Sequence, residues 1–519
     1  MRAFLIGLLL PLGLMAAIPP AEWIPVRWEG GALELKRLEA VGTPVTVDAQ
    51  ATATREWYDA KHLRLLADSP FNCLLLTWSV GGSSAEESAH RKAVAEFAEA
   101  ARTKGFVTLG VILHGKDWMS AVEAAASFRL DGVVLEGEFP SDAASEAFAT
   151  LQKANPAAVV VPLGAIESAP RDQHFPILAS NSGLWPGMLS ADEASGWGAG
   201  PTSNPWVLSN AWRVGALRAR DRKRPAWMGH RPKRHRDQPI ELPEYLRAVA
   251  DSAMAGGRWV VSLDPDWRAR LANGETAALA EWRQVAGLAA YFEERKQWRD
   301  YPAYPGFVVV DDPQAPSAFA HGDMLNMLAV RQIPHKVVLR TDFDQAPLEA
   351  TTAVVAFDAA PPNDIEQDAL QAFTHRGGTL LLGPHWVMAK FKSPDRFKKL
   401  IAGKGTILSF TTADVKADEF SRNARHELDE HNAGPKLYNV GSIMSWYSSA
   451  PGGAQTLLQL TEYGDYPTEN VTVRFGHKIT RAQAMCLGRE PEDLEIYEEE
   501  HGAEFVVPEV PGYCAVTIE

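Results

Sequence analysis

The sequence predicts an α/β protein: a TIM (β/α)8 barrel followed by a flavodoxin-like α/β domain and a small C-terminal β-sandwich. Three observations support this prediction. From residue 72 to residue 263, apolar strand-like segments alternate with helical or loop segments, as parallel strands with right-handed crossovers require. Eight such units in about 230 residues match the size of a TIM barrel. After about residue 405 the pattern changes to short strands separated by turn residues.

The expected barrel strands are short apolar runs. They cover residues 72–78, 106–113, 130–135, 157–162, 176–179, 205–209, 225–228 and 258–263. The segment 23–28 is an extra strand candidate, and the fifth unit is the least regular because residues 181–203 are rich in Gly, Ser and Pro. Helical spacing predicts helices over residues 56–67, 85–104, 121–128, 141–154, 242–255 and 275–296.

The second half of the chain divides at a Tyr- and Pro-containing link, residues 301–305. Strands are expected over residues 307–311, 337–339, 353–357 and 379–382, with helices over 318–331 and 365–376. Further strands are expected over residues 457–461, 471–475 and 512–518. We therefore expect a signal peptide over residues 1–20, the barrel over 21–300, the α/β domain over 301–404 and the sandwich over 405–519.

The N-terminus has the features of a secretory signal peptide. Arg2 provides a positive charge, residues 3–14 form an apolar run, and Ala16, Ala17 and Ala21 are small residues near a cleavage region. The apolar run is shorter than the roughly 20 residues that a membrane-spanning helix needs. We expect a periplasmic or secreted protein with no membrane segment after signal removal.

Charge and cysteine content exclude some classes. A formal net charge of −14 argues against nucleic-acid binding, which depends on Lys and Arg to neutralise phosphates. Three cysteines cannot form a disulfide framework. Cys73 lies in an apolar strand and is expected to be a buried thiol. Cys486 and Cys514 are able to pair in an oxidising compartment, but two buried free thiols is the preferred interpretation.

No cofactor or metal is expected. Residues 403–406 (Gly-Lys-Gly-Thr) lack the spacing of a phosphate-binding loop, and a Gly-x-Ser-x-Gly nucleophile motif is absent. His426 and His431 superficially resemble a zinc-protease helix. They are five residues apart, so they diverge by about 140° around a helix.

Three acids are the candidate catalytic residues, because TIM barrels place active sites at the carboxyl ends of their strands. Glycosidic-bond cleavage usually needs one protonated and one ionised carboxyl group. Glu138 is the candidate acid: Glu136, two residues earlier on an extended chain, faces the same side, and like-charge repulsion disfavours ionisation of both. Asp264 is the candidate opposing carboxylate. For each acid alone, loop capping or pairing with arginine is an equally good interpretation.

Other polar and aromatic residues at the strand ends are candidates for substrate binding. They are Trp78, His114, Trp185, Asn210, Trp212, His230 and Asp266. Indole rings pack on the C–H faces of sugars, although most tryptophans here are expected to be core residues. The basic run 231–236 follows the seventh strand and would suit an anionic sugar. A solvated surface loop is its more common explanation.

The middle and C-terminal segments carry a family resemblance. Residues 353–358, 369–373, 376–382, 504–508 and 512–516 resemble segments of secreted multi-domain glycoside hydrolases related to the bacterial β-galactosidases with a trimerisation domain. In that family a catalytic TIM barrel precedes a glutamine-amidotransferase-like layer and a small β-sandwich. The middle domain here has no cysteine, so the resemblance implies a structural or oligomeric role for it, with homo-oligomers formed through this domain.

The barrel departs from this family. Those galactosidases are retaining enzymes with one glutamate after strand four and another after strand seven, whereas here strand seven ends in Gly229-His230. Residues 131–138 have a local likeness to the chitinase-like signature Asp-Gly-x-Asp-x-Asp-x-Glu. Asp131, Gly132, Glu136 and Glu138 fall on its positions, while Val134 replaces one acid.

The sequence therefore indicates an exported glycoside hydrolase-like protein acting on an unidentified glycan at the carboxyl face of the barrel. The alternative is a non-catalytic carbohydrate-binding or oligomeric scaffold protein.

Overall fold

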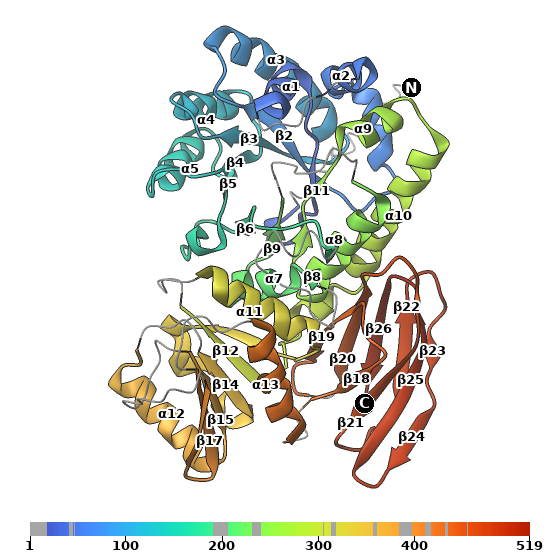
Figure 1. The fold of residues 1–519 in the computed structure, drawn as a ribbon. Coiled ribbons are helices and arrows are strands. Elements are labelled where there is room, and N and C mark those ends of the chain that lie inside the picture. Colours follow the sequence, from blue (N-terminus) through green and yellow to red (C-terminus); the bar gives the residue numbers. More distant parts are fainter. Residues whose placement is uncertain are drawn as a thin grey trace, which may run out of the picture.

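A computed structural model shows the arrangement of the chain. It describes residues 18–40, 45, 47–189, 206–230, 240–304, 306–312, 318–356, 361–383, 397–410, 417–430, 434–453 and 455–519. The chain forms a barrel, a six-stranded sheet with helices, and two antiparallel sheets (Figure 1).

The barrel is a closed parallel sheet with the strand order β10-β9-β6-β5-β4-β3-β2-β1-β11. Its strands are β1 (Pro25–Arg27), β2 (Cys73–Ser79), β3 (Val107–Leu113), β4 (Gly132–Glu136), β5 (Val159–Gly164), β6 (Leu178–Ser180), β9 (Ala226–Met228), β10 (Arg258–Trp259) and β11 (Val261–Ser262). Because β10 and β11 are two parts of one strand separated at Val260, the barrel has eight staves. The predicted TIM barrel is confirmed.

Helices surround the barrel, as the alternating pattern predicts. They are α1 (Gly31–Ala40), α2 (Asp48–Arg55), α3 (Ser84–Arg102), α4 (Trp118–Ser127), α5 (Ala143–Ala154), α7 (Ala211–Ala219), α8 (Leu242–Met254), α9 (Pro265–Ala272) and α10 (Thr276–Glu294). Short 3-10 helices are η1 (Pro20–Glu22), η2 (Ala60–Leu66), η3 (Ile166–Ser168) and η4 (Lys296–Asp300). The fifth crossover, between β5 and β6, holds only η3. The helix expected over residues 56–67 is η2, preceded by α2.

Two strand assignments in the barrel differ from the prediction. The extra candidate near residue 25 is the first barrel strand, β1, which pairs with β2 and β11. The predicted sixth strand is β8 (Trp206–Leu208), which lies outside the barrel and pairs antiparallel with β7 (Gly187–Leu189). Its apolar composition reflects packing in the layer around the barrel, where Val207 is 2% exposed. Strand β4, which ends at Glu136, is therefore the fourth stave.

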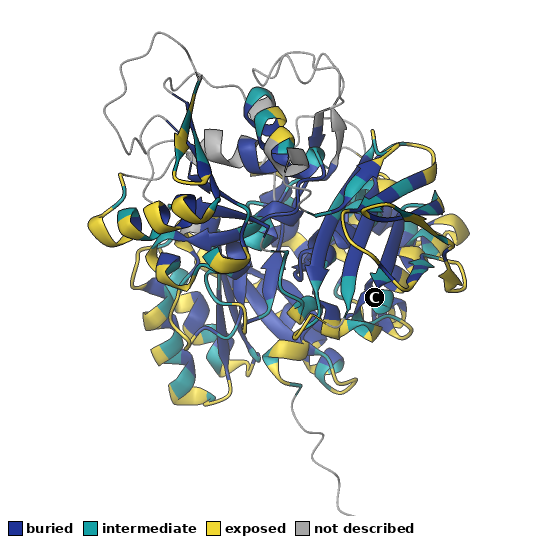
Figure 2. Ribbon diagram, turned by 90° about the horizontal axis from the view of Figure 1, so that it is seen from below, coloured by how far each residue is buried: buried dark blue, intermediate teal, exposed yellow. Residues whose placement is uncertain are grey.

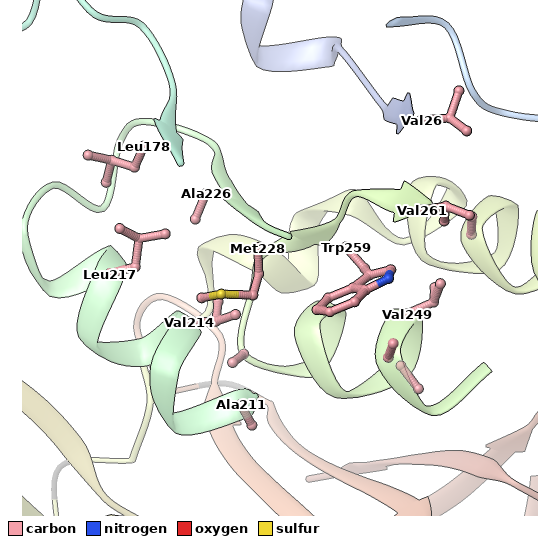
Figure 3. Close-up of a cluster of buried hydrophobic side chains, with 14 of the residues drawn as sticks. Val26, Leu178, Ala211, Val214, Leu217, Ala226, Met228, Val249, Trp259 and Val261 are labelled. Atoms are coloured by element: carbon pink, nitrogen blue, oxygen red, sulfur yellow. The ribbon is translucent and has the colours of Figure 1, made fainter. Parts of the chain in front are cut away.

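Side chains alternate between the barrel interior and the helix layer. Leu75, Val111, Val134, Val161 and Trp227 belong to the interior cluster. Intervening residues face outward and pack on helices; Figure 3 shows such side chains of β6, β9 and β10 beside α7 and α8. Buried residues concentrate in the strands, and exposed ones lie along the outer sides of the helices (Figure 2).

The middle part is a six-stranded sheet, parallel except for one edge strand, in the order β13-β12-β14-β15-β17-β16. Its strands are β12 (Phe307–Asp311), β13 (Lys336–Leu339), β14 (Ala353–Ala356), β15 (Thr379–Leu382), β16 (Phe397–Ala402) and β17 (Gly405–Phe410). The helical segments are α11 (Ala318–Val330), η5 (Arg340–Gln345), η6 (Leu348–Ala350), α12 (Asp364–Arg376) and α13 (Ala417–Glu430). Because β17 pairs with β15 and β16, the predicted boundary at residue 405 falls inside this sheet.

The C-terminal part consists of two antiparallel sheets, as predicted. One is ordered β18-β21-β25-β24 and the other β19-β20-β26-β22-β23. The strands are β18 (Lys436–Tyr438), β19 (Ile443–Ser449), β20 (Thr456–Glu462), β21 (Thr468–Phe475), β22 (Ala482–Cys486), β23 (Glu492–Asp493), β24 (Ile496–Glu499), β25 (Gly502–Val510) and β26 (Tyr513–Ile518).

The two cysteines of this sandwich form a disulfide. Cys486 and Cys514 lie opposite each other on β22 and β26. The preferred interpretation of two free thiols is therefore wrong, because antiparallel pairing places the two side chains next to each other. Cys73 is buried and free, as predicted.

The middle part and the sandwich lie side by side beneath the barrel, with α11 between the barrel and the rest of the middle part (Figure 1). None of the helices in the described ranges is both long and apolar enough to cross a membrane.

Candidate active site

The candidate site lies at the carboxyl ends of the barrel strands, and alternation decides which residues point to the axis. On β4, Val134 packs in the interior, so Glu136, two residues later, faces the axis too. On β1, Val26 packs in the outer layer, so the next residue, Arg27, faces inward. Arg27 is 1% exposed and Glu136 is 4% exposed.

Arg27 and Glu136 form a buried bidentate ion pair. Nη1 of Arg27 donates to Glu136 Oε2 at 3.0 Å, and Nη2 donates to Oε1 at 2.8 Å. Nη1 also donates to Glu29 Oε1 at 3.0 Å. Burial alone would lower the pKa of Arg27, but the charges of Glu136 and Glu29 outweigh burial and raise that pKa above its usual value. The guanidinium is thus shared between two buried carboxylates.

A second arginine extends the network. Arg37 Nη2 lies 3.7 Å from Glu29 Oε2, and Arg37 Nε donates to Glu34 Oε2 at 2.8 Å. The Thr77 hydroxyl of β2 donates to the same Glu34 oxygen at 3.1 Å. All four side chains are buried. The first, second and fourth staves are thus joined by one chain of ion pairs and hydrogen bonds.

The seventh stave, β9, lacks a carboxylate at its end. Gly229 and His230 follow it, and a Cβ added to Gly229 would lie 3.7 Å from Arg27 Nη2. The Arg27 guanidinium therefore lies beside the end of the seventh strand. In the galactosidase family that the sequence resembles, the second glutamate follows this strand. Burial lowers the pKa of His230 to about 4, and the nearby charges of Arg213 and Arg27 act in the same direction. The His230 ring is therefore neutral near pH 7.

Glu138 lies outside this network. Gly137 has a φ of 108°, a conformation that favours glycine, and it turns the chain after β4. The expectation of one extended chain through Glu138 is therefore wrong: Glu136 is buried and Glu138 is exposed. In the described part of the chain, no hydrogen bond or ion pair holds the Glu138 side chain. Next to it, Phe139 packs edge-on against exposed His114, with ring centroids 5.1 Å apart.

Asp264 and Asp266 lie at the start of α9. Asp264 is the N-cap, and its side chain accepts a hydrogen bond from the Asp266 backbone N–H at 2.9 Å. The Asp264 backbone N–H donates to the Tyr245 hydroxyl at 2.9 Å. Asp266 accepts a longer hydrogen bond from Gln50 at 3.4 Å. The loop-capping role, expected as the alternative, fits Asp264.

Trp185 and His230 come together in an aromatic cluster. The Trp185 ring packs edge-on against His230, with centroids 6.1 Å apart, and against Trp259, with centroids 5.4 Å apart. Asn210 positions this loop: its side chain donates to the Leu184 carbonyl and accepts from the Leu184 N–H, both at 2.8 Å. Asn210 is fully buried, so it holds the backbone next to Trp185 in place and does not line the surface of the site.

Two other expected stacking platforms belong to the core. Trp78 faces outward from β2, is 0% exposed, and donates from Nε1 to the Ala121 carbonyl of α4 at 2.8 Å. Its position next to the strand end is therefore misleading, because strand alternation turns it away from the axis. Trp212 is also buried in the helix layer, and the Arg213 guanidinium lies 4.5 Å from its ring centroid.

The loop that contains Asn210 also joins the barrel to the middle part through a buried polar junction. On α8, Asp251 accepts hydrogen bonds from the Ser209 hydroxyl, at 2.6 Å, and from the Asn210 backbone N–H. Asn326 of α11 accepts from the Ser209 N–H at 3.2 Å and donates to the Val207 carbonyl at 2.5 Å. Burial raises the pKa of Asp251 to about 6.

This junction predicts a pH-dependent stability. Since the folded-state pKa of Asp251 lies above its ordinary value of 3.8, folding is more favourable when the carboxyl is protonated. The free energy of unfolding should fall by about 3 kcal/mol as pH rises from about 3 to 7. Urea unfolding of wild type and Asp251→Asn across this range measures the effect. The difference between the two proteins should change with pH; a constant difference would contradict the assignment.

Several predicted features lie outside the described residues. They are the basic run 231–236, His431 and most of the predicted signal peptide. Among the described residues, no group of three or more His, Cys, Asp or Glu side chains is arranged to hold a metal ion.

Two residues of this network were not predicted from the sequence. Arg27 forms the ion pair with Glu136, and Glu29 accepts a hydrogen bond from the same guanidinium. A signal was present: the strand candidate 23–28 carries a charged residue at position 27 between apolar neighbours, and a glutamate follows it at position 29. A charged residue inside a buried strand is retained where it has a partner.

No protein-family model and no curated protein matches this chain. Solved structures do. A β-galactosidase from Bacillus circulans sp. alkalophilus is similar with a TM-score of 0.60 at 8% identity, covering 96% of this chain and 99% of that one. The α-L-fucosidase isoenzyme 2 from Paenibacillus thiaminolyticus gives 0.56 at 11% identity, covering 89% and 96%. A β-galactosidase from Rahnella sp. R3 gives 0.57 at 9% identity, covering 96% and 98%. This chain therefore shares the fold of these proteins over nearly their whole length.

Proposed function

We propose that this protein is an exported glycoside hydrolase that acts on a glycan at the carboxyl face of its barrel. One observation carries the proposal: Glu136 ends the fourth stave as a buried carboxylate that faces the axis and is paired with Arg27. The shared fold with β-galactosidases and an α-L-fucosidase supports the same class of substrate. Export rests on the predicted signal peptide.

The two glutamates after β4 suit different roles. Glycosidic cleavage develops positive charge at the anomeric carbon, and a carboxylate held ionised stabilises it. Glu136 fits this role because its carboxylate faces the barrel axis and is held there by two hydrogen bonds from Arg27. The second role, protonating the leaving oxygen, needs a carboxyl group that can reach the substrate. Glu138 fits it because its side chain is exposed and unrestrained by the described ion pairs.

Two other groups would serve the bound sugar. The neutral His230 ring offers a nitrogen that accepts a hydrogen bond from a hydroxyl, and Trp185, packed against it, offers an indole face. His114, exposed beside Phe139, lies next to the loop that carries Glu138. The basic run 231–236 suits an acidic sugar, so uronate and sulfated glycans belong among the substrates to be tested.

Turnover of a glycan panel by wild type, Glu136→Gln and Glu138→Gln tests the proposal. Each substitution keeps the shape of the side chain and removes its charge. We expect kcat/KM to fall about 100-fold in each, the lower end of the usual contribution of an acid or base. Glu138→Gln should lose less on aryl glycosides whose leaving group needs no proton. Glu146→Gln on α5, an exposed glutamate, is the matched control and should retain wild-type turnover.

The outcomes separate the competing hypotheses. Binding without turnover by wild type on every glycan would favour the non-catalytic carbohydrate-binding protein. Turnover unchanged by both substitutions would remove Glu136 and Glu138 from the mechanism. Light scattering of the purified protein tests homo-oligomer formation, for which we propose the middle part as the contact.

A further inference from the structure

A small cavity lies where the three parts of the chain meet. It has a volume of about 50 Å³ and is bounded by the end of α7, the segment after α8, η4, the start of β13 and one residue of β19. Trp298 and Trp446 form part of its wall. Since Gly256 and Gly257 lead into β10, the cavity lies at the amino-terminal end of the barrel strands. The candidate active site is at the opposite end.

Four basic side chains line this cavity: Arg218, Arg222, Arg299 and Lys336. Arg218 is only 7% exposed. Its guanidinium donates to the carbonyl oxygens of Gly256, at 2.7 Å, and Arg222, at 3.4 Å, and these acceptors carry no full charge. A Cβ on Gly256 would lie 1.6 Å from Arg218 Nη1, so the glycine is required for the guanidinium to occupy this place.

Among the residues that the structure describes, the negative charge near the cavity is too small to balance these cations. Glu293 pairs with Arg299, but it also holds Arg258 at 3.0 Å. Asp300 is exposed, and its charge acts on Arg218 and Arg222. Glu293 and Asp300 are thus the acids that face five cations.

The pKa shifts agree with this imbalance. Burial, together with like-charge repulsion from Arg222 and Arg299, lowers the pKa of Arg218 to about 10. Burial and Arg222 also lower the pKa of Lys336. Cations crowded in this way gain stability from any anion that enters between them.

We propose that this cavity binds a small oxyanion, phosphate or sulfate, which holds the barrel and the middle part together. Guanidinium groups present paired N–H donors that match the oxygens of such anions, and Lys336 adds a flexible ammonium. The two sides of the site come from separate parts of the chain: the arginines belong to the barrel, and Lys336 begins β13 of the middle sheet. An anion shared between them stabilises their contact and leaves the barrel mouth untouched.

Thermal unfolding and calorimetric titration of the full chain with sodium phosphate, sodium sulfate and sodium chloride at equal ionic strength test this site. Binding to the native state alone raises the unfolding temperature by mass action. We expect phosphate or sulfate to raise it by a few degrees and to saturate below about 20 mM, where general salting-out by these ions is still weak. Chloride should have no saturable effect.

Two neighbouring cations provide a matched pair of variants. Arg222→Gln removes an exposed charge that lines the cavity, whereas Lys223→Gln removes an equal charge one residue away that does not. Arg222→Gln should weaken oxyanion binding at least tenfold, and Lys223→Gln should leave it within twofold of wild type. Lys336→Gln provides a second test from the other side of the cavity.

Equal responses to phosphate, sulfate and chloride would overturn the proposal. So would an identical loss of binding in Arg222→Gln and Lys223→Gln, since that result would reflect the net charge of the protein alone. Neither outcome depends on glycan turnover, so this site and the proposed hydrolase activity succeed or fail separately.

Discussion

Replacing Arg27 by methionine should lower the free energy of unfolding by about 3–5 kcal/mol, the usual cost of leaving a buried charge without its partner. Arg27 pairs with Glu136 and Glu29, and each of the three residues is at most 4% exposed. Methionine fills similar space, so the loss would reflect the two carboxylates left buried beside it. Urea unfolding of wild type and Arg27→Met measures the change.

The double variant Arg27→Met/Glu136→Met distinguishes lost pairing from lost packing. Replacing both partners of a buried pair by apolar residues is often neutral, so this variant should be clearly more stable than Arg27→Met alone. Glu29 would keep Arg37 as a partner at 3.7 Å. Lys61→Met, which removes the exposed ion pair with Asp59, is the control and should change little. A double variant no more stable than Arg27→Met would contradict the role of charge.

Removing the disulfide should destabilise the sandwich by about 3.5 kcal/mol, the chain-entropy value for a loop of this length. Cys486 and Cys514 are 28 residues apart, and the bond ties the neighbouring strands β22 and β26 together in the core of the sandwich. Thermal unfolding with and without reductant, and of Cys486→Ala/Cys514→Ala, measures the loss.

Two controls accompany this prediction. The double alanine variant should show no further response to reductant. Thiol titration of the unreduced, denatured protein should find one free thiol, that of Cys73. Three reactive thiols would show that the bond does not form.

Much of the architecture was predictable because it depends on local patterns. Alternation of apolar runs with helical spacing identified a barrel, and its number of staves was correct. The identity of one barrel strand was not predictable from apolar content. Strand β1 has only three residues, and one of them is the charged Arg27. Strand β8 has the apolar composition of a barrel strand although it lies outside the barrel. Membership in a closed sheet is decided by pairing with distant strands, which a local window does not contain.

The site residues stay predictions, but the structure shows where their side chains lie. Glu136, singled out at the end of a predicted strand, ends β4 and faces the barrel axis. The side chains that contact Glu136 inside the barrel depend on strand alternation and on the length of those side chains. Arg27 is 109 residues from its partner Glu136, so no spacing rule connects them. Conversely, Trp78 was expected near the substrate because it ends the predicted strand 72–78. In the structure its side chain lies on the outer face of β2 and packs in the helix layer.

Gly229 has a consequence for how this chain relates to two-carboxylate enzymes. The atoms nearest to an added Cβ there are Val260 Cβ, Arg27 Nη2 and the Ser180 carbonyl oxygen, at 3.6, 3.7 and 3.8 Å, all ordinary van der Waals distances. A Cβ at the end of the seventh stave would thus fit without displacing a neighbour, and it would lie beside the Arg27 guanidinium. The substitution Gly229→Glu would add a carboxyl group at the end of the seventh stave: position 229 follows β9, whereas Glu136 ends β4.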